Sequence, residues 1–404
     1  MPVLASTSRV QMSYLKEIVF GEVPVTGVVR NIRNTGESLN YSISKTSSDE
    51  INAYRAVSSM VATSAEAAGA LNIQMSFGEY DEFLAATLQN TWIKVGAAGL
   101  SSVFSSTITT GAITAGVAVT DFATLKRGQW FTLSGTGTTN DGKLFRVSKI
   151  TAPTTTVITL DVSTPGIPGG PFAATVLRSS RLSNGVIQPS YALQREANDV
   201  GEFFVFRGMT VSSMSLNMAS GSLTSGDFNF MGRDALRAAA TFMPSAAVDS
   251  QAYPNMSGVS GTACALWVGG VPLLGTFVNS IALSYDNALR QQTALCALGS
   301  VGIGNGTIMA SINMEVYFAS GATFYSQLLD NSSVEVAFTA FDNAGNGYVF
   351  TIPKGNVSSY SVNAGSKDSE LMAQITVTAL LDLGNADATL RKVFFIDRMG
   401  DAMI

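Results

Sequence analysis

The sequence predicts an all-β protein with only a few short helices. Apolar and polar residues alternate with period two in many short runs, which is the pattern of half-buried strands. Glycine is abundant, at 38 of 404 residues, as turn-rich β proteins require. Only 13% of residues are charged, against about 25% in an ordinary soluble domain. Because interface cores are depleted in charge, we favour extensive subunit interfaces over the alternative of a monomer with a polar, uncharged surface.

The alternating runs are spread along the whole chain. The clearest are Leu39–Ile43, Leu71–Phe77, Met214–Met218, Ile281–Tyr285, Ile312–Val316 and Val334–Phe341. The last run leads to an Asn346-Gly347 dipeptide and returns as Tyr348–Ile352. Asn-Gly favours a type I′ turn, which requires positive φ at both central residues, so this pair of runs predicts a hairpin.

Helix signals are few. The segment Asp81–Asn90 begins with acidic residues, which the helix dipole favours in a first turn, and places its apolar residues on one face. A second helix is predicted over Arg233–Phe242, ended by Pro244. A third is predicted near residues 321–331 by an internal echo. Ile73–Asn90 and Ile312–Asn331 share a strand followed by a helix in which phenylalanine, leucine and asparagine recur at identical spacing. This echo favours a duplication, with chance similarity between β-rich halves as the alternative.

The runs group into three parts. We predict a first unit formed by residues 1–96 and 189–250, and a second formed by residues 251–404. Residues 97–188 form a small inserted β domain, because their hairpin around Trp130 and the Pro/Gly-rich break Pro165–Pro171 differ from both flanks.

Catalytic chemistry is not indicated. The chain has no histidine, which removes the commonest general base and the usual serine and cysteine triads. Cys264 and Cys296 lack metal or redox spacing and are interpreted as two buried free thiols, with a single disulfide as the alternative. The acidic residues at 79–82 are interpreted as a solvated helix start, and Asp342–Gly347 as a hairpin tip rather than a calcium loop. We therefore predict no catalytic, cofactor-binding or metal-binding residues.

The charge balance also limits the partners. The net charge is −5, and the basic residues are scattered rather than clustered, so a dedicated nucleic-acid-binding surface is not expected. No run of about 18 apolar residues occurs, and Met1–Tyr14 lacks the features of a secretory signal, so no membrane partner is expected.

An ordered set of motifs occupies the N-terminal part of the chain. It consists of Tyr14, Glu17, Phe20, Gly21, Pro24, Thr35, Gly36, Ser38, Leu39, Glu50, Tyr80, Asp81, Leu84 and Trp92. The set resembles the major tail tube proteins of long-tailed bacteriophages (siphophages). The match is close in this region, whereas the remainder of the chain is similar only in pattern.

The resemblance implies an architecture. The expected units are β-sandwiches whose long hairpins join around a ring into a closed β-barrel, and rings stack into a tube that conducts the genome at ejection. With two units per chain, the ring is expected to be a trimer that mimics a hexamer; a hexamer of chains is the alternative. The wall of the bore is expected to be polar or acidic, and the inserted domain to face outward.

The resemblance also implies partners and a location. The chain would associate with itself and with tape-measure, tail terminator and baseplate proteins, and double-stranded DNA would pass without specific binding. It would assemble in the host bacterial cytoplasm and reside in the virion tail. The alternatives are another non-enzymatic virion β protein (baseplate or decoration), a carbohydrate-binding adhesin and a tail-fibre depolymerase. A binding groove is not indicated, because Trp92, Trp130 and Trp267 are dispersed.

Overall fold

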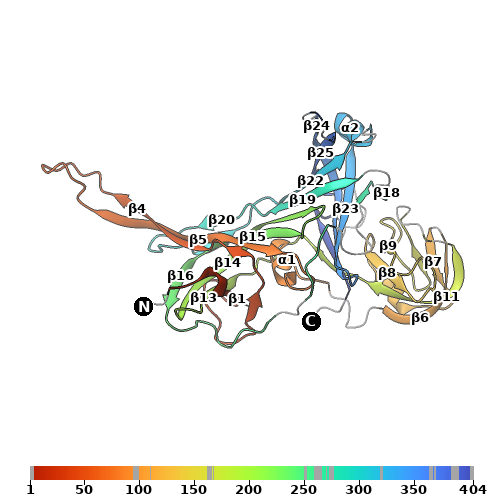
Figure 1. Ribbon diagram of the computed structural model, residues 1–404, viewed down its shortest axis with the longest axis horizontal. Coiled ribbons are helices and arrows are strands. Elements are labelled where there is room, and N and C mark those ends of the chain that lie inside the picture. Colours follow the sequence, from red (N-terminus) through yellow and green to blue (C-terminus); the bar gives the residue numbers. More distant parts are fainter. Residues whose placement is uncertain are drawn as a thin grey trace.

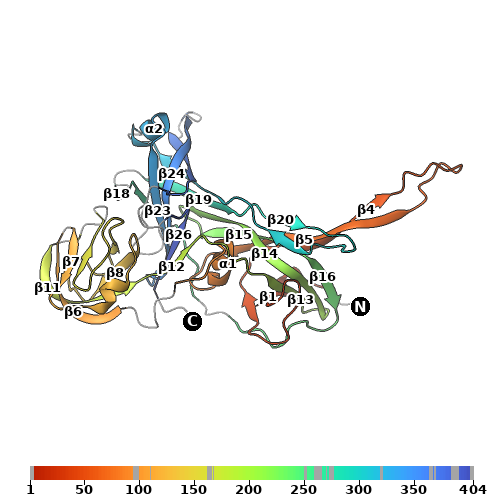
Figure 2. The ribbon, with the colours of Figure 1, turned by 180° about the vertical axis from the view of Figure 1, so that it is seen from behind.

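The computed structural model describes residues 4–93, 100–109, 111–161, 166, 168–249, 253–258, 266–269, 271–272, 277–318, 322–363, 367, 370–383 and 391–400. Strands dominate it, as predicted, and the two α-helices in the described part are short. Figure 1 and Figure 2 show a β-rich body, a long hairpin that projects from one end, and a separate small sheet at the other end.

Eight strands run side by side through the body, and every neighbouring pair is antiparallel. In spatial order they are β4 (Asn40–Ser47), β5 (Met60–Gln74), β15 (Ser225–Gly232), β14 (Glu202–Ala219), β19 (Val278–Asp286), β22 (Met309–Tyr317), β25 (Met372–Ala379) and β24 (Gly347–Asn363). We call this row the central sheet. Its strands turn from nearly horizontal at β5 to nearly vertical at β24 in the view of Figure 1, so the sheet is strongly twisted.

The two long strands β14 and β24 leave the central sheet and continue into outer strands. The first half of β14 lies between β13 (Tyr191–Ala197) and β16 (Asp234–Ala238), and β13 also pairs with β1 (Val10–Lys16), which pairs with β2 (Arg30–Ile32). The first half of β24 lies between β23 (Ser333–Phe341) and β26 (Phe395–Met399). Strand β23 also pairs with β17 (Leu266–Val268), which pairs with β18 (Val271–Pro272).

These pairings describe one topology that occurs twice. We call β1–β5 and β13–β16 with helix α1 (Asp81–Thr87) the first unit, and β17–β26 with helix α2 (Ala322–Leu329) the second unit. In each unit a hairpin, a helix and a second hairpin follow one another. The bulges in β14 and β24 coincide when Val211–Asn217 is placed on Val357–Asn363, and five of these seven residues are identical.

The sheet registers correct one detail of the predicted echo. They place Ile73 at the position of Val316, because both lie opposite equivalent residues of the next strand. The echo had placed Ile73 on Ile312, so the strand alignment was wrong by four residues, whereas the predicted helices near 81–90 and 321–331 are confirmed.

The segment between β5 and β12 (Ser180–Ser183) forms its own six-stranded sheet. Its order is β10 (Val157–Thr159), β7 (Ala112–Ala115), β6 (Leu100–Ile108), β11 (Gly169–Arg178), β8 (Trp130–Ser134) and β9 (Leu144–Arg146). A separate apolar cluster that includes Phe122, Phe131 and Phe145 fills it. Strand β12 already pairs with β26 of the second unit. Short elements complete the fold: η1 (Thr7–Arg9), η2 (Thr120–Thr124), β3 (Gly36–Glu37), β20 (Arg290–Gln292) and β21 (Gly302–Gly304).

Three local predictions are wrong. The segment predicted as a helix over Arg233–Phe242 contains β16, because pairing with the edge of β14 overrides its modest helix propensity. The hairpin turn expected at Asn346-Gly347 lies over residues 342–346, where Asp342 N–H donates to Asn346 O at 2.8 Å. Cys296, expected to be buried, is exposed in a loop; Cys264 lies outside the described residues.

Candidate assembly surface

The central sheet has one apolar and one polar face. In β14, Met214, Leu216 and Met218 are buried, and the residues between them are serine and asparagine. The same alternation runs through the other strands, whose buried side chains join one core that spans both units. We call the opposite side of the sheet the polar face.

The polar face is acidic. It carries the carboxylates of Glu66, Asp227, Asp286 and Glu315, which alternate with buried residues of their strands. Strands β5, β15, β19, β22 and β25 contain no lysine or arginine, and neither do residues 40–44 of β4, 210–219 of β14 and 355–363 of β24. The basic residues of these last three strands, Lys45, Arg207 and Lys354, lie outside those stretches. Uncharged donors hold two of the carboxylates: Asn229 Nδ2 donates to Asp227 at 2.6 Å, and Asn279 Nδ2 donates to Glu315 at 2.7 Å.

Both ends of the central sheet are open. No described strand pairs with the outer side of β4, or with the outer side of β24 beyond Asn356. An open strand edge presents unpaired backbone N–H and C=O groups that can pair with another chain. Within the chain, the pairing of β14 with β19 shows how one unit joins the next.

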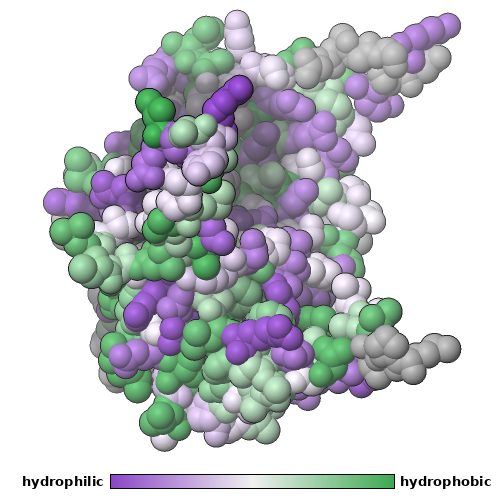
Figure 3. Space-filling view, turned by 90° about the vertical axis from the view of Figure 1, so that its left-hand side faces the viewer, coloured by the Kyte–Doolittle hydropathy of each residue, from purple (hydrophilic) through white to green (hydrophobic). Residues whose placement is uncertain are grey.

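The projecting hairpin of β4 and β5 is a second unpartnered surface. Its outer part and the loop at its tip carry exposed apolar side chains, namely Ile43, Ile51, Tyr54, Val57, Met60 and Val61. Ile51 and Tyr54 are 103% and 90% exposed. Figure 3, which views the molecule from this side, shows hydrophobic and hydrophilic side chains interspersed over the surface. Such an apolar concentration on a projecting arm indicates a contact with a partner.

Four of the motif residues lie in the core of the first unit. Tyr14, Leu39, Tyr80 and Leu84 are buried, and the Tyr14 ring lies 4.8 Å from that of Phe83. Burial raises the pKa of the Tyr14 and Tyr80 hydroxyls well above their ordinary value. These hydroxyls therefore act as neutral, packed groups.

A buried carboxylate organises the turn after β1. Glu17 accepts hydrogen bonds from the N–H groups of Gly21 and Gly208, both at 2.8 Å, and from the Ser190 hydroxyl at 2.7 Å. Burial raises the pKa of Glu17 although these donors oppose the rise. Gly21, a motif residue, has φ +76°, and a side chain at Gly208 would collide with the Phe20 ring, so this turn needs glycine at both positions.

The remaining motif residues serve the hairpin and its entry. Thr35 N–H donates to Asn72 O at 2.9 Å, and the Ser38 hydroxyl accepts from Ala70 N–H at 3.0 Å. Gly36 pairs with Asn72 in β3, and Pro24 is half-buried in the preceding loop. Glu50 lies near the tip of the arm, where it accepts from the Ser58 hydroxyl at 2.7 Å.

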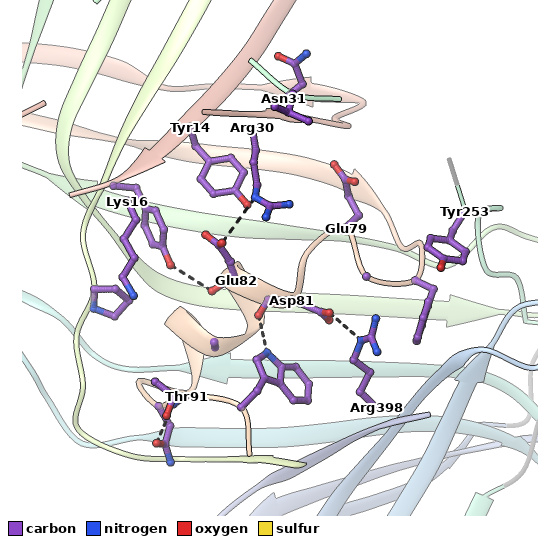
Figure 4. Close-up of a pocket in the computed structure, with 18 of the residues that line it drawn as sticks. Tyr14, Lys16, Arg30, Asn31, Glu79, Asp81, Glu82, Thr91, Tyr253 and Arg398 are labelled. Carbon is purple, nitrogen blue, oxygen red and sulfur yellow. Dashed lines mark hydrogen bonds and ion pairs between the residues drawn. The ribbon is translucent and has the colours of Figure 1, made fainter. Parts of the chain in front are cut away.

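Asp81 joins the two units. Its carboxylate forms an ion pair with Arg398 Nε at 2.8 Å and accepts a hydrogen bond from the Tyr348 hydroxyl at 2.6 Å, while its backbone O accepts from Trp92 Nε1 at 2.8 Å. Figure 4 shows Arg398 pointing toward Asp81. Asp81 is buried, so its interpretation as part of a solvated helix start is wrong. Arg398 and Tyr348 belong to the second unit and are far away in sequence, which is why the motif analysis missed them.

A cavity of about 320 Å³ lies beside this contact. Tyr14, Lys16, Arg30, Glu82 and Trp92 are among the residues that line it, and Figure 4 shows that side chains of both charges face it. Arg30 and Glu82 are 4.0 Å apart. In the described residues, no group of three histidine, cysteine or acidic side chains is placed to hold a metal ion. None of the helices described is long and apolar enough to cross a membrane.

The inserted sheet is fixed to the second unit by a further buried contact. The Trp130 ring lies 4.6 Å from that of Trp267, and Arg146 and Lys149 form ion pairs with Glu335 of β23. Next to it, Arg181 forms an ion pair with Asp397 at 2.8 Å and donates to the backbone O of Arg127 and Gly128.

Comparison with known proteins gives one family. The sequence model of a family described as phage tail tube protein matches residues 7–379, which is most of the chain. No curated protein matches the sequence.

Proposed function

Because the chain belongs to the phage tail tube protein family, and is thus a structural protein of the virion tail, we propose that it polymerises as stacked rings that form the conduit for genome ejection. The observation that carries the proposal is the central sheet, which is twisted, open at both edges and polar on one face. If the β24 edge of one copy pairs with the β4 edge of the next, every edge in a ring is satisfied and the sheet closes into a barrel.

The duplication supports a ring of three chains. Each chain supplies two units of the same topology, so three copies would give a ring of six units; six copies would give twelve. The contact between copies is heterologous, since one edge meets a different edge, and such contacts form rings when the rotation closes. Axial contacts do not close, and the projecting arm with Ile51 and Tyr54 is suited to reach a neighbouring ring.

The polar face would line the bore. Its four carboxylates and the lack of basic residues in the described strand segments would repel the phosphates of double-stranded DNA, so that DNA slides without specific binding. The inserted sheet packs through Trp130 on β17 and β23, two outer strands of the second unit. This attachment favours an outward position for the domain predicted over residues 97–188.

The remaining expectations follow from this role. A tube of this kind needs a length-setting tape-measure protein and end partners, a tail terminator and a baseplate, and it would assemble in the host bacterial cytoplasm. The described contacts within the chain do not identify where these partners bind. We propose that they bind at the ends of the tube.

Purified protein tests the proposal directly. We expect rings or tubes in negative-stain electron microscopy as the concentration rises, and a ring of three chains in native mass spectrometry. Rings that never stack would instead favour a baseplate or decoration protein. A protein that remains monomeric at high concentration would contradict the proposal.

A further inference from the structure

We infer that the junction between the two units of one chain is repeated, residue for residue, between neighbouring copies. In this arrangement Tyr360 of one copy lies opposite Tyr41 of the next copy, and that same neighbour covers helix α2. The inference rests on the proposed ring and specifies which side chains meet in it.

The internal junction provides the pattern. Residues 213–219 of β14 pair with residues 280–286 of β19 in antiparallel register, with Met214 opposite Tyr285 and Leu216 opposite Leu283. These four side chains are buried, and the alternate positions, such as Ser215 opposite Ser284, lie on the polar face. A seam of this kind has an apolar side in the core and a polar side toward the polar face, where Asp286 lies opposite Ser213.

The two open edges can be aligned with the two strands of the internal junction, and several of the aligned residues are identical. The shared bulge places Ser213–Asn217 of β14 on Ser359–Asn363 of β24. The pairing of β4 with β5 and of β19 with β22 places Tyr41 on Tyr285. Transferring the internal register gives the predicted pairs: Ser359 with Ser42, Tyr360 with Tyr41, Ser361 with Asn40, and Val362 with Leu39.

Exposure at the edges fits this assignment. Val362 is 39% exposed, whereas its counterpart Leu216 is 4% exposed. Tyr41 and Tyr360 are only partly buried, whereas Tyr285 and Met214 are buried. Three of the four apolar side chains of the seam thus remain partly uncovered at the ends of the chain, whereas the fourth, Leu39, is already buried.

The two helices show the same difference. Leu84 and Leu88 at α1 are 1% and 0% exposed, whereas Tyr325 and Leu329 at the matching positions of α2 are 50% and 67% exposed. The side chains of α1 are less exposed because residues of the second unit contact the region around this helix.

The contacts between α1 and the second unit are specific. Asn287 Nδ2 donates to Thr87 O, and Gln89 Nε2 donates to Asn305 Oδ1, both at 2.8 Å. The Tyr348 hydroxyl donates to Asp81, as described above. In a ring, the first unit of the next copy takes the place relative to α2 that the second unit takes relative to α1. The exposed Tyr325 and Leu329 therefore become buried.

The register can be read with engineered disulfides. Both natural cysteines are first replaced by serine, and Asn40→Cys and Ser361→Cys are combined in the full chain. Directly opposed strand residues have Cβ atoms about 4.5–5.5 Å apart, close to disulfide geometry, whereas diagonal neighbours are about 7–8 Å apart. The control pair is therefore Ser42→Cys with Ser361→Cys, which lies on the same face two residues away.

The outcomes separate the register from the proposed function. We expect the 40/361 pair to give covalent dimers and trimers on non-reducing gels under mild oxidation, with at least tenfold less product from the 42/361 pair. Rings that form normally but link the control pair, or neither pair, would overturn the register while leaving the tube function intact. If the cysteine-free protein forms no rings at any concentration, both proposals are overturned.

A second measurement tests the cover over α2. Tyr325→Asp with Leu329→Asp should raise the concentration needed for ring formation at least tenfold, because each charge would be buried without a partner. The control is Ile150→Asp in a loop of the inserted domain, a residue that is 85% exposed in the free chain. Circular dichroism of dilute protein verifies that each variant folds. Assembly of the double variant at the wild-type concentration would refute this part of the inference.

Discussion

Replacement of Asp81 by alanine is expected to loosen the connection between the two units. The change removes a carboxylate that accepts from Tyr348 and pairs with Arg398, whose side chain is only 6% exposed. The guanidinium lies 4.0 Å from the centre of the Phe77 ring and cannot turn out to water without leaving this packing. Asp81→Ala therefore leaves a buried cation without the carboxylate that balances it.

The size of the effect follows from this burial. Removing one partner of a buried ion pair costs about 3–5 kcal/mol. Tyr348→Phe removes the hydrogen bond that the hydroxyl donates to Asp81 and the one that it accepts from Gly78 N–H at 2.9 Å. About 1.5–3 kcal/mol is expected for the bond to the charged acceptor and about 1 kcal/mol for the other. With a urea dependence of about 3 kcal/mol/M, the loss of about 3 kcal/mol shifts the unfolding midpoint by about 1 M. The expected order of destabilisation is Asp81→Ala, then Tyr348→Phe.

Trp92 supplies the signal for the assay, since its indole donates to Asp81 O and lies 6.5 Å from the Tyr348 ring. Urea titrations followed by tryptophan fluorescence compare each variant with Glu82→Ala. That control removes a carboxylate from the same helical turn, but Glu82 is half-exposed and 4.0 Å from Arg30, so little change is expected. Coincident midpoints for Asp81→Ala and Glu82→Ala would refute the reasoning.

Three further changes address the inserted sheet and the bore. Deletion of residues 100–178 should leave tubes intact in electron micrographs but lower the melting temperature, because it uncovers buried side chains of β17 and β23; loss of tubes would contradict the outward position. Burial opposes ionisation of Glu335, yet Arg146 and a neighbouring lysine hold its pKa below the ordinary value, so the folded state favours the carboxylate. This stability is therefore fully present above about pH 4.5 and is lost below it, as the pH falls through the lowered pKa of folded Glu335; protease sensitivity of the insert should rise over that interval, and Glu335→Gln should abolish the pH dependence. The double change Asp286→Lys with Glu315→Lys should make tubes retain DNA in filter-binding assays. The logarithm of the association constant should fall by about 0.9 per phosphate contact for each unit of log salt concentration. No retention would argue against a lumenal polar face.

Local patterns in the sequence were sufficient for most strands of the central sheet and for both α-helices. Period-two alternation identifies buried residues such as Leu216 and Leu283 because each strand has one face on the core. The prediction of a helix over Arg233–Phe242 was wrong because the conformation of this segment depends on its pairing with β14, which is not a local property of the sequence. Cross-strand ion pairs of Arg207 with Asp234 and of Arg237 with Glu202 accompany the pairing of β16 with β14. No local propensity contains that information.

The assembly surface was only partly predictable for the same reason. The motif residue Asp81 was found, but its partners Tyr348 and Arg398 depend on how the second unit folds against the first. One signal was present and not used: the near-identical segments Val211–Asn217 and Val357–Asn363 mark the equivalent bulges of β14 and β24. Aligning them would have revealed the duplicated register, and with it the two open edges, without a structure.

The duplication has a physical consequence for the proposed ring. A junction inside one chain forms at the high effective concentration that a covalent connection provides, whereas a junction between chains must also offset the lost freedom of two bodies. A ring of three duplicated chains needs half as many junctions between chains as a ring of six single units. The two units are also free to differ: the first has the long arm, whereas the second has the shorter β20–β21 hairpin and holds the inserted sheet. Alternate positions around such a ring would therefore present different surfaces, which six identical units cannot do.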